Sequence, residues 1–277
     1  MAKFLSKDGK FYMREGKLLG YTPPQASLTP QTGITYTDGL PNDWNTMKEI
    51  AKAISEAYGG SGGINPNTTG SIYVNKGNTW AYKITPGDTI NVTSQIGTYT
   101  YAVMGFNNFV LTNENHYGGT HTTAGLTFGA VDCVTTAKMN SNNTNSGGWG
   151  ECLMCTSKMP TLQSGMPDTI AQVRVLYLEN GNSTILYSDD YMFLPAAKEV
   201  FGDRGFSPLK EGKSLTQFAY YKNGGSKIKS FSGGALIWWL RSVRYDTDAH
   251  FCSVSTSGTA SADAASYFFG TAPCFCV

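Results

Sequence analysis

Charged residues are scarce in this chain: they make up only 15% of its 277 residues, and the formal net charge is +1. Neither sign dominates, so no basic patch of the kind that binds nucleic acid or an anionic membrane is indicated. No apolar run approaches the roughly 20 residues that a transmembrane helix needs, and residues 1–20 contain no apolar core of signal-peptide length. We therefore expect a protein that is made in the cytoplasm and does not insert into a membrane.

Motifs of catalysis are also missing. The chain has no nucleophile elbow, phosphate-binding loop, H-E-x-x-H motif or dinucleotide fingerprint. The three histidines (His116, His121 and His250) are dispersed, and a hydrogen-bonded structural role is favoured for His121 over a metal site with Asp132 or Cys133. We predict no catalytic residues, no metal and no cofactor.

Cysteine usage favours packing over chemistry. Cys152-x-x-Cys155 has neither a second such pair nor histidines at zinc spacing. Reduced, buried thiols are the expected state of the six cysteines, which are Cys133, Cys152, Cys155, Cys252, Cys274 and Cys276.

The first 63 residues are expected to form an N-terminal attachment and oligomerisation region. Residues 4–21 alternate around two turn signals and predict a small β-hairpin, and the proline-rich residues 22–42 predict an extended linker. Asp43 is expected to cap a helix over residues 44–58, where six apolar residues recur at helical spacing: Trp44, Met47, Ile50, Ala51, Ile54 and Tyr58. This stripe is expected either to make an oligomer contact, such as a trimeric stalk, or to dock on the downstream domain.

Residues 64–277 are expected to form a second domain of mixed composition. Strands are predicted at 71–74, 80–84, 89–92, 99–103, 106–111 and 126–134, followed by helical spacing over 149–159 and a short helix capped by Asp168. Residues 173–178 and 184–187 flank a Glu-Asn-Gly-Asn turn and predict a hairpin, and residues 191–194 and 195–201 predict a strand and a helix ended by Gly202. Periodicity alone therefore gives an α+β fold.

The segment 230–277 lacks Asn, Gln, Glu, Lys and Met altogether, although the earlier chain uses Asn and Lys freely. Solvated loops normally use such residues. Its apolar residues recur in short blocks, W-W-L-R-S, F-C-x-V and F-C-V, separated by runs of small polar and aromatic residues without amphipathic period. We expect the blocks to form a structural frame, which consists of Trp238, Trp239, Leu240, Arg241, Phe251, Val254 and Phe275.

The frame W-W-L-R-S, the following F-C-x-V-x-x-x-G-x-A and the terminal G-x-A-x-x-F-C-V resemble the variable proteins of diversity-generating retroelements in phages and prophages of gut bacteria. In that family an error-prone reverse transcriptase randomises template adenines. Randomised Asn codons cannot encode Lys, Glu, Gln, Met or Trp, and the residues between the frame positions all lie within the permitted set. Val243 departs from the family, which often has Pro there, and so does the ending T-A-P-C-F-C-V.

The resemblance implies a C-type lectin fold of the kind shared with formylglycine-generating enzymes, with a variable region at 238–277. It also implies ligand contacts from the residues between the frame positions. These are Val243, Arg244, Tyr245, Asp246, Thr247, Asp248, Ala249, His250, Ser253, Ser255, Thr256, Ser257, Thr259, Ser261, Ala262, Asp263, Ser266, Tyr267, Phe268 and Phe269. Aromatic anchors mixed with small hydroxyl residues are typical of antibody paratopes.

The implied function is that of a tail-associated display protein of a virion, made in the bacterial cytoplasm. It would bind a protein or glycan on a host surface, contact other virion proteins and form a homo-oligomer. Two alternatives remain at this point. One is a structural virion subunit without a diversified site, and the other is a formylglycine-generating type of enzyme, which would require reactive cysteines such as Cys274 and Cys276.

Overall fold

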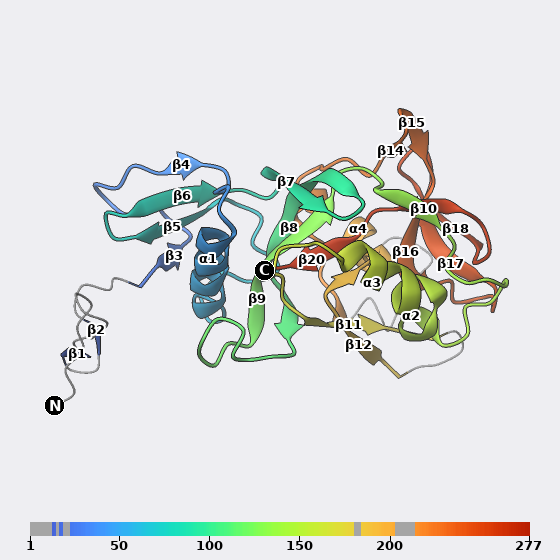
Figure 1. Cartoon of the computed structure of the whole chain (residues 1–277), viewed down its shortest axis with the longest axis horizontal. Coiled ribbons are helices and arrows are strands. Elements are labelled where there is room, and N and C mark those ends of the chain that lie inside the picture. The colour runs from blue at the N-terminus through green and yellow to red at the C-terminus, as the bar shows by residue number, and fades with distance from the viewer. Residues whose placement is uncertain (1–12, 15–16, 19–22, 180–183, 203–213) are drawn as a thin grey trace.

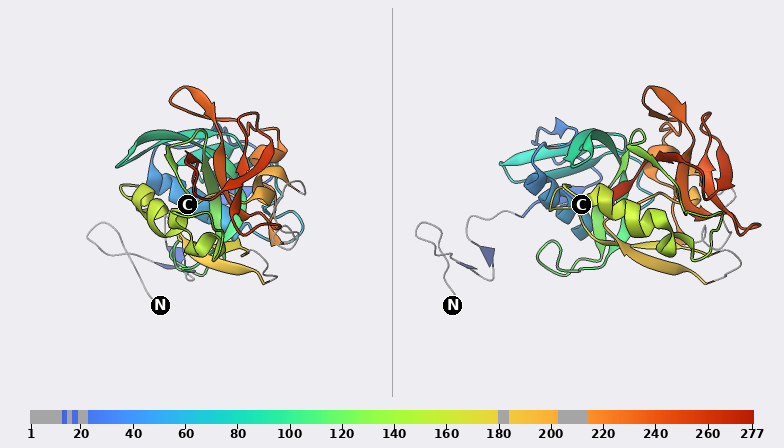
Figure 2. Two further views of the ribbon diagram at one scale, coloured as in Figure 1. Left: turned by 90° about the vertical axis from the view of Figure 1, so that its right-hand side faces the viewer. Right: turned by 45° about the vertical axis from the view of Figure 1, so that its right-hand side comes forward.

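A computed structural model describes residues 13–14, 17–18, 23–179, 184–202 and 214–277. Short helices accompany several mainly antiparallel β-sheets, so the fold is α+β, as expected from the sequence pattern. The early strands and the first helix lie at one end of the molecule, the strands of residues 229–264 lie toward the other end, and the C-terminus lies between them (Figure 1). Figure 2 shows the same order from a second direction. No helix of the described residues is long and apolar enough to cross a membrane.

A seven-stranded sheet joins the two ends. Its order is β12-β11-β8-β9-β20-β13, and β7 also pairs with β8. The strands are β7 (Thr89–Ser94), β8 (Gly97–Leu111), β9 (Thr123–Ala130), β11 (Val173–Tyr177), β12 (Leu186–Asp190), β13 (Met192–Phe193) and β20 (Cys274–Cys276). Phe275 of β20 stacks on Phe128 of β9, with 5.2 Å between the ring centroids. The last strand therefore lies between β9 and β13, inside the sheet.

A five-stranded sheet carries most of the biased segment. Its order is β10-β19-β16-β17-β18, in which β16 runs antiparallel to β17 and parallel to β19. The strands are β10 (Thr135–Ala137), β16 (Trp238–Val243), β17 (His250–Val254), β18 (Ala260–Ala264) and β19 (Phe269–Thr271). All six residues of β16 are buried, so this strand is the centre of the sheet and of its core. A separate hairpin precedes it, formed by β14 (Lys229–Phe231) and β15 (Gly234–Leu236).

Helix α1 (Trp44–Glu56) begins where the sequence predicts, because the Asp43 carboxylate accepts a 2.7 Å hydrogen bond from the Thr46 amide. It ends two residues before Tyr58, whose side chain is exposed. The middle of the predicted apolar stripe is buried, namely Met47, Ile50, Ala51 and Ile54. This face packs on β9, so of the two expected uses of the stripe the structure has the docking one.

The proline-rich segment before α1 is more ordered than an extended linker. It contains β3 (Gln25–Ser27) and β4 (Thr37–Asp38), which complete a four-stranded sheet of order β3-β5-β6-β4 with β5 (Ile72–Lys76) and β6 (Trp80–Ile84). The two strands supply partners to the free backbone groups at the edges of the β5–β6 hairpin. Strands β1 (Met13–Arg14) and β2 (Lys17–Leu18) pair within the predicted N-terminal hairpin, and the rest of that hairpin lies outside the described residues.

The remaining helices differ in part from the prediction. The helical spacing over 149–159 forms α2 (Gly148–Glu151), a π-helical segment η1 (Met154–Lys158) and α3 (Met159–Gln163). The run is interrupted because Cys152 has an extended backbone, with ψ 153°. The helix expected after Asp168 is absent from this described stretch, where Ile170 and Pro167 close a turn and Ala171 bonds to Cys276 of β20. Helices α4 (Ala197–Phe201), which ends at Gly202 as predicted, and α6 (Ala219–Lys222) are the other helices of the described residues.

Replacing Gly125 of β9 tests the close packing of α1. A Cβ atom added at Gly125 would lie 1.9 Å from the backbone oxygen of Ala51. We expect Gly125→Ala to lower the free energy of unfolding by roughly 1–3 kcal/mol or more, because backbone on both sides must shift. Urea unfolding measures the change.

The matched control is Gly70→Ala, where an added Cβ has nothing within 4 Å. Equal urea midpoints for the two variants would show that α1 does not rest on β9 in solution.

Candidate functional site

The predicted frame lies inside the molecule. Trp238, Trp239, Leu240, Arg241, Phe251, Val254 and Phe275 all have 0% exposed surface. The indole N–H of Trp239 donates to the Ala137 carbonyl at 3.0 Å, and that of Trp238 donates to the Lys227 carbonyl at 2.9 Å. The apolar surface of the frame is therefore buried, and the two indole N–H groups are hydrogen-bonded within the core.

Arg241 is the buried charge of the frame. Its guanidinium forms a bidentate ion pair with Glu199 of α4, at 2.6 and 2.7 Å, and also donates to the carbonyls of Leu194 and Leu176. Glu199 also accepts a hydrogen bond from the Ala196 amide at 2.8 Å. The adjacent Ser242 hydroxyl accepts from the Ala197 amide at 2.9 Å. These bonds attach β16 to α4 and to the strand end before it.

Three loops meet at one end of the five-stranded sheet. Loop 244–249 connects β16 to β17, loop 265–268 connects β18 to β19, and the segment 139–146 packs against both. The Ala265 amide donates to the Ala249 carbonyl at 3.0 Å, and the amides of Met139 and Asn140 both donate to the Ala265 carbonyl. We call the surface formed by these three loops the loop surface. It lies at the end of the molecule that contains β16, β17 and β18, far from α1 (Figure 1).

The loop surface exposes large aromatic side chains. Tyr245 is 60% exposed, Tyr267 is 53% exposed and Phe268 is 65% exposed. Lys138 lies over the Phe268 ring, with its Nζ 4.9 Å from the centroid. Exposed rings of this size, held on a rigid base, offer large contact area at low entropic cost.

Charges on the loop surface are partly paired. Arg244 binds Asp246 through two hydrogen bonds, at 2.5 and 3.0 Å. These bonds lower the pKa of Asp246 and raise the pKa of Arg244. The Asp248 side chain is exposed beside them.

A second group of the predicted contact residues lies at the opposite end of β17. Ser255, Ser257 and Thr259 form a turn closed by hydrogen bonds among their hydroxyl groups, and Thr256 is exposed within it. Because β17 and β18 are antiparallel, Ser261, Ala262 and Asp263 lie along the edge strand between this turn and the loop surface. The structure thus brings residues 244–250 and 266–268 together and separates them from residues 255–259.

Two predicted contact residues are placed where no ligand on this surface can reach them. Val243 is 0% exposed and Ser253 is 1% exposed. Ser253 donates a 2.5 Å hydrogen bond to Asp263, so its hydroxyl serves the sheet. Phe269 is half-buried and packs on Trp239, with 4.8 Å between the ring centroids. Val243 and Ser253 are buried because both faces of their strands are covered here: all of β16 and residues 251–254 of β17 are buried.

The residues that hold the loop surface from outside the biased segment were missed by the sequence analysis. Asn143 accepts hydrogen bonds from both the amide and the hydroxyl group of Ser266. Asn145 is fully buried and donates to three backbone carbonyls, those of Thr247, Asp248 and His250. The Asn- and Ser-rich composition of residues 140–146 was the available signal, because such side chains often bond to nearby backbone.

The thiol groups are poorly suited to chemistry. All six cysteines are free and buried. Burial raises the pKa of Cys133, Cys152 and Cys276 to about 12, and it also raises the pKa values of Cys155 and Cys274. A reactive cysteine needs a lowered pKa and access to solvent.

No group of three or more potential metal ligands occurs among the described residues. His121 is buried, with Nδ1 3.2 Å from the Gly119 carbonyl and Nε2 3.4 Å from Glu56. It therefore has the hydrogen-bonded structural setting that the sequence analysis favoured.

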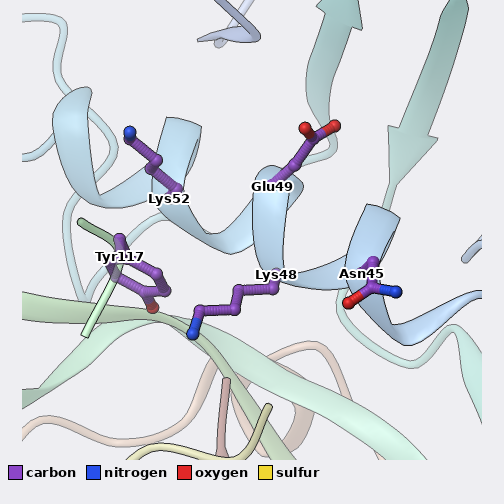
Figure 3. Close-up of a pocket in the computed structure, with 5 residues that line it drawn as sticks. All are labelled: Asn45, Lys48, Glu49, Lys52 and Tyr117. Atoms are coloured by element: carbon purple, nitrogen blue, oxygen red, sulfur yellow. The ribbon is translucent and has the colours of Figure 1, made fainter. Parts of the chain in front are cut away.

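A surface pocket of about 320 Å³ opens beside α1, lined by Asn45, Lys48, Glu49, Lys52 and Tyr117. Figure 3 shows Lys48 reaching alongside Tyr117, while Glu49 and Lys52 point away from it. Glu49 is bonded to Lys76 at 2.5 and 2.7 Å. Burial, and next the charge of Lys48, lowers the pKa of the nearby His116 to about 4. None of these residues belongs to the biased segment, so the pocket and the loop surface are separate features.

Fold and site together define an α+β protein in which a buried aromatic frame carries an exposed loop surface. A family model described as a domain of unknown function (DUF6273) matches residues 126–277, which is just over half of the chain, and the chain belongs to this family. The matched part begins in β9 and includes the whole five-stranded sheet. Searches of curated proteins and of solved structures gave no significant match.

Removing the charge of Glu199 tests the buried ion pair. We expect Glu199→Gln to lower the free energy of unfolding by about 3–5 kcal/mol, because it leaves the Arg241 guanidinium buried without its counter-ion. The measurement is urea unfolding at neutral pH.

As a control, Asp38→Asn removes one partner of the exposed Asp38–Lys83 pair, which is 3.0 Å long. We expect nearly the wild-type midpoint for this variant, because solvent screens exposed pairs. A Glu199→Gln protein as stable as the control would mean that the buried pair contributes little.

Alkaline pH should destabilise the protein through its thiols. The raised pKa values in the folded state mean that the unfolded chain loses thiol protons first. Their contribution to stability is complete below pH 9, the ordinary thiol value, and is lost as the pH rises toward about 12. Urea midpoints between pH 7 and pH 11 should therefore fall above pH 9.

Labelling with iodoacetamide provides an independent readout. We expect slow labelling of the native protein at pH 8 and fast labelling of all six cysteines in urea. Rapid native labelling of Cys274 or Cys276 would contradict the buried setting and favour an enzymatic role.

Proposed function

We propose that this protein displays a ligand-binding surface whose side chains are diversified, as in the variable proteins of diversity-generating retroelements. The observation that carries the proposal is the contrast within one segment. The frame residues of 238–277 are completely buried, whereas Tyr245, Tyr267 and Phe268 are more than half exposed at one end of the same sheet. A protein that must vary its surface while keeping its fold needs this separation.

The proposed fold of residues 64–277 is of the C-type lectin kind, used here to present loops. The motif resemblance supports this, and so does a late sheet whose strands are joined by exposed loops. Fold alone does not specify function, so the exposed residues of the loop surface carry the proposal.

The proposed ligand is a protein or glycan on the surface of a bacterial host cell. Aromatic rings and small hydroxyl side chains supply the contacts on the loop surface, a combination that binds many partners. The proposed setting is the tail of a phage or prophage virion, with the protein present in several copies. Multivalent display raises the apparent affinity of sites that are individually weak.

Sequencing of this gene in a single host population, together with its flanking DNA, tests the diversification. We expect substitutions to concentrate between residues 243 and 269, to spare residues 238–242, and to match adenines in a nearby near-copy of the segment. Because Val243 and Ser253 are buried, substitutions there should be limited to small or apolar residues. An invariant segment without a nearby copy would instead favour a structural virion subunit.

Two variants distinguish the role of the frame residues in stability from the role of the exposed residues in binding. We expect Trp239→Ala to lower the free energy of unfolding by about 3–5 kcal/mol, because it removes a fully buried indole. Tyr267→Ala should leave the urea midpoint almost unchanged, because its ring is 53% exposed, and should weaken adsorption to host cells.

Adsorption of the fluorescently labelled protein to cells of the host population measures the second effect. Unchanged adsorption of both Tyr267→Ala and Tyr245→Ala would contradict the proposed contact surface, whatever their stability.

A further inference from the structure

Residues 244–250, which we call loop 244–250, comprise the loop between β16 and β17 and the first residue of β17. Their contacts with the rest of the protein include several hydrogen bonds to backbone oxygens of the loop. The Asn145 side-chain amide donates to the Thr247 carbonyl at 2.7 Å and to the His250 carbonyl at 2.9 Å. The Asn145 backbone amide donates to the Asp248 carbonyl at 2.8 Å. Each acceptor is a backbone oxygen, so none of these three bonds depends on which side chains the loop carries.

The ends of the loop follow the same rule. The Arg244 amide donates to the His250 carbonyl at 3.0 Å, and the Ala265 amide donates to the Ala249 carbonyl at 3.0 Å. Side chains of the loop make three further bonds: the Ala249 amide donates to the Thr247 hydroxyl at 3.3 Å, and the Arg244 guanidinium donates twice to the Asp246 carboxylate. The exposed side chains of Tyr245 and Asp248 form no hydrogen bond that supports the loop.

Asn145 itself lies outside the biased segment and is anchored in the core. Its exposed surface is 0%, and its carbonyl accepts a hydrogen bond from the Gly148 amide at 3.0 Å. Removing this buried amide is costly, because the Thr247 carbonyl loses the Asn145 donor and the His250 carbonyl keeps only the Arg244 amide.

We propose that Asn145 is a positioning residue of the ligand-binding surface: it holds the backbone of loop 244–250 in one conformation whatever side chains occupy Tyr245 to Ala249. This inference rests on the proposed function for the role of the loop as a contact surface. It adds the mechanism by which that surface tolerates changes in its own sequence. Because the hydrogen-bond donor comes from outside the biased segment, changes of the loop side chains leave the donor in place.

Amide hydrogen exchange of the full chain tests the proposal without any ligand. We expect Asn145→Ala to speed exchange of the Arg244 and Ala265 amides by about tenfold or more, because the loop opens locally once its donors are removed. Exchange of the Leu126 amide, which bonds to Val277 in the seven-stranded sheet, should not change. Asn145→Ser, whose side chain is too short to reach both carbonyls, gives the same test if Asn145→Ala does not fold.

Asn107→Ala is the matched control. Asn107 is also a buried asparagine whose amide donates to two carbonyls, those of Ile54 and Ile64, but it lies beside α1. We expect this variant to lose stability while leaving exchange at Arg244 and Ala265 at the wild-type rate once global unfolding is taken into account. Equal effects of the two variants at Arg244 would overturn a local role of Asn145.

The double variant Tyr245→Ser/Asp248→Ser tests whether the loop keeps its conformation when its own side chains change. Exchange at Arg244 and Ala265 should stay within about twofold of wild type, because the bonds that hold the loop are kept. Exchange accelerated as much as in Asn145→Ala would overturn the proposal, since the loop would then depend on its own side chains. If this variant keeps a rigid loop and also keeps host-cell adsorption, the proposed function fails while the positioning role of Asn145 stands.

Discussion

The buried ion pair between Arg241 and Glu199 is the constraint on which the C-terminal half of the structure depends. A charge inside a protein is tolerated only when it is paired and fully hydrogen-bonded, and this guanidinium has a bidentate carboxylate and two backbone carbonyls. The carboxylate belongs to Glu199 of α4, and the two carbonyls belong to Leu176 of β11 and to Leu194, which follows β13. The position of β16 is therefore specified by polar geometry as well as by apolar burial, and β16 lies at the centre of the five-stranded sheet.

The rest of the site follows from that central strand. Trp238 and Trp239 have the largest side chains of β16, and both are fully buried. Each indole N–H donates a hydrogen bond to a backbone carbonyl of another segment. The loops that leave the sheet can then be exposed without loss of the core. Asn145 supplies donors to one of them from outside, so exposed aromatic rings such as Tyr245 need not contribute to folding. In the function that we propose, stability and recognition therefore depend on different residues of one short segment.

Local patterns gave correct expectations where a single element decides its own structure. Asp43 caps α1, Gly202 ends α4, and the strands on either side of residues 180–183 pair as a hairpin. The expectations were wrong where the structure of a segment depends on partners that are distant in sequence. The proline-rich segment before α1 reads as a linker, yet β3 and β4 complete a sheet because the β5–β6 hairpin has free edges. Apolar spacing around Cys152 predicts one helix, and the structure interrupts it.

The sequence by itself determined the α+β composition and the buried frame. It also separated the frame from a compositionally biased set of residues. Both could be predicted because apolar spacing and residue composition are visible in the sequence at each position. Only the tertiary structure decided which biased residues share a surface. Antiparallel pairing of β17 with β18 sends residues 255–259 to one end of the sheet and residues 244–250 and 266–268 to the other. It also decided that Val243 and Ser253 face inward and that Asn145 holds the loop surface. The contacts of Asn145 with loop 244–250 join positions about a hundred residues apart, and no local pattern encodes them.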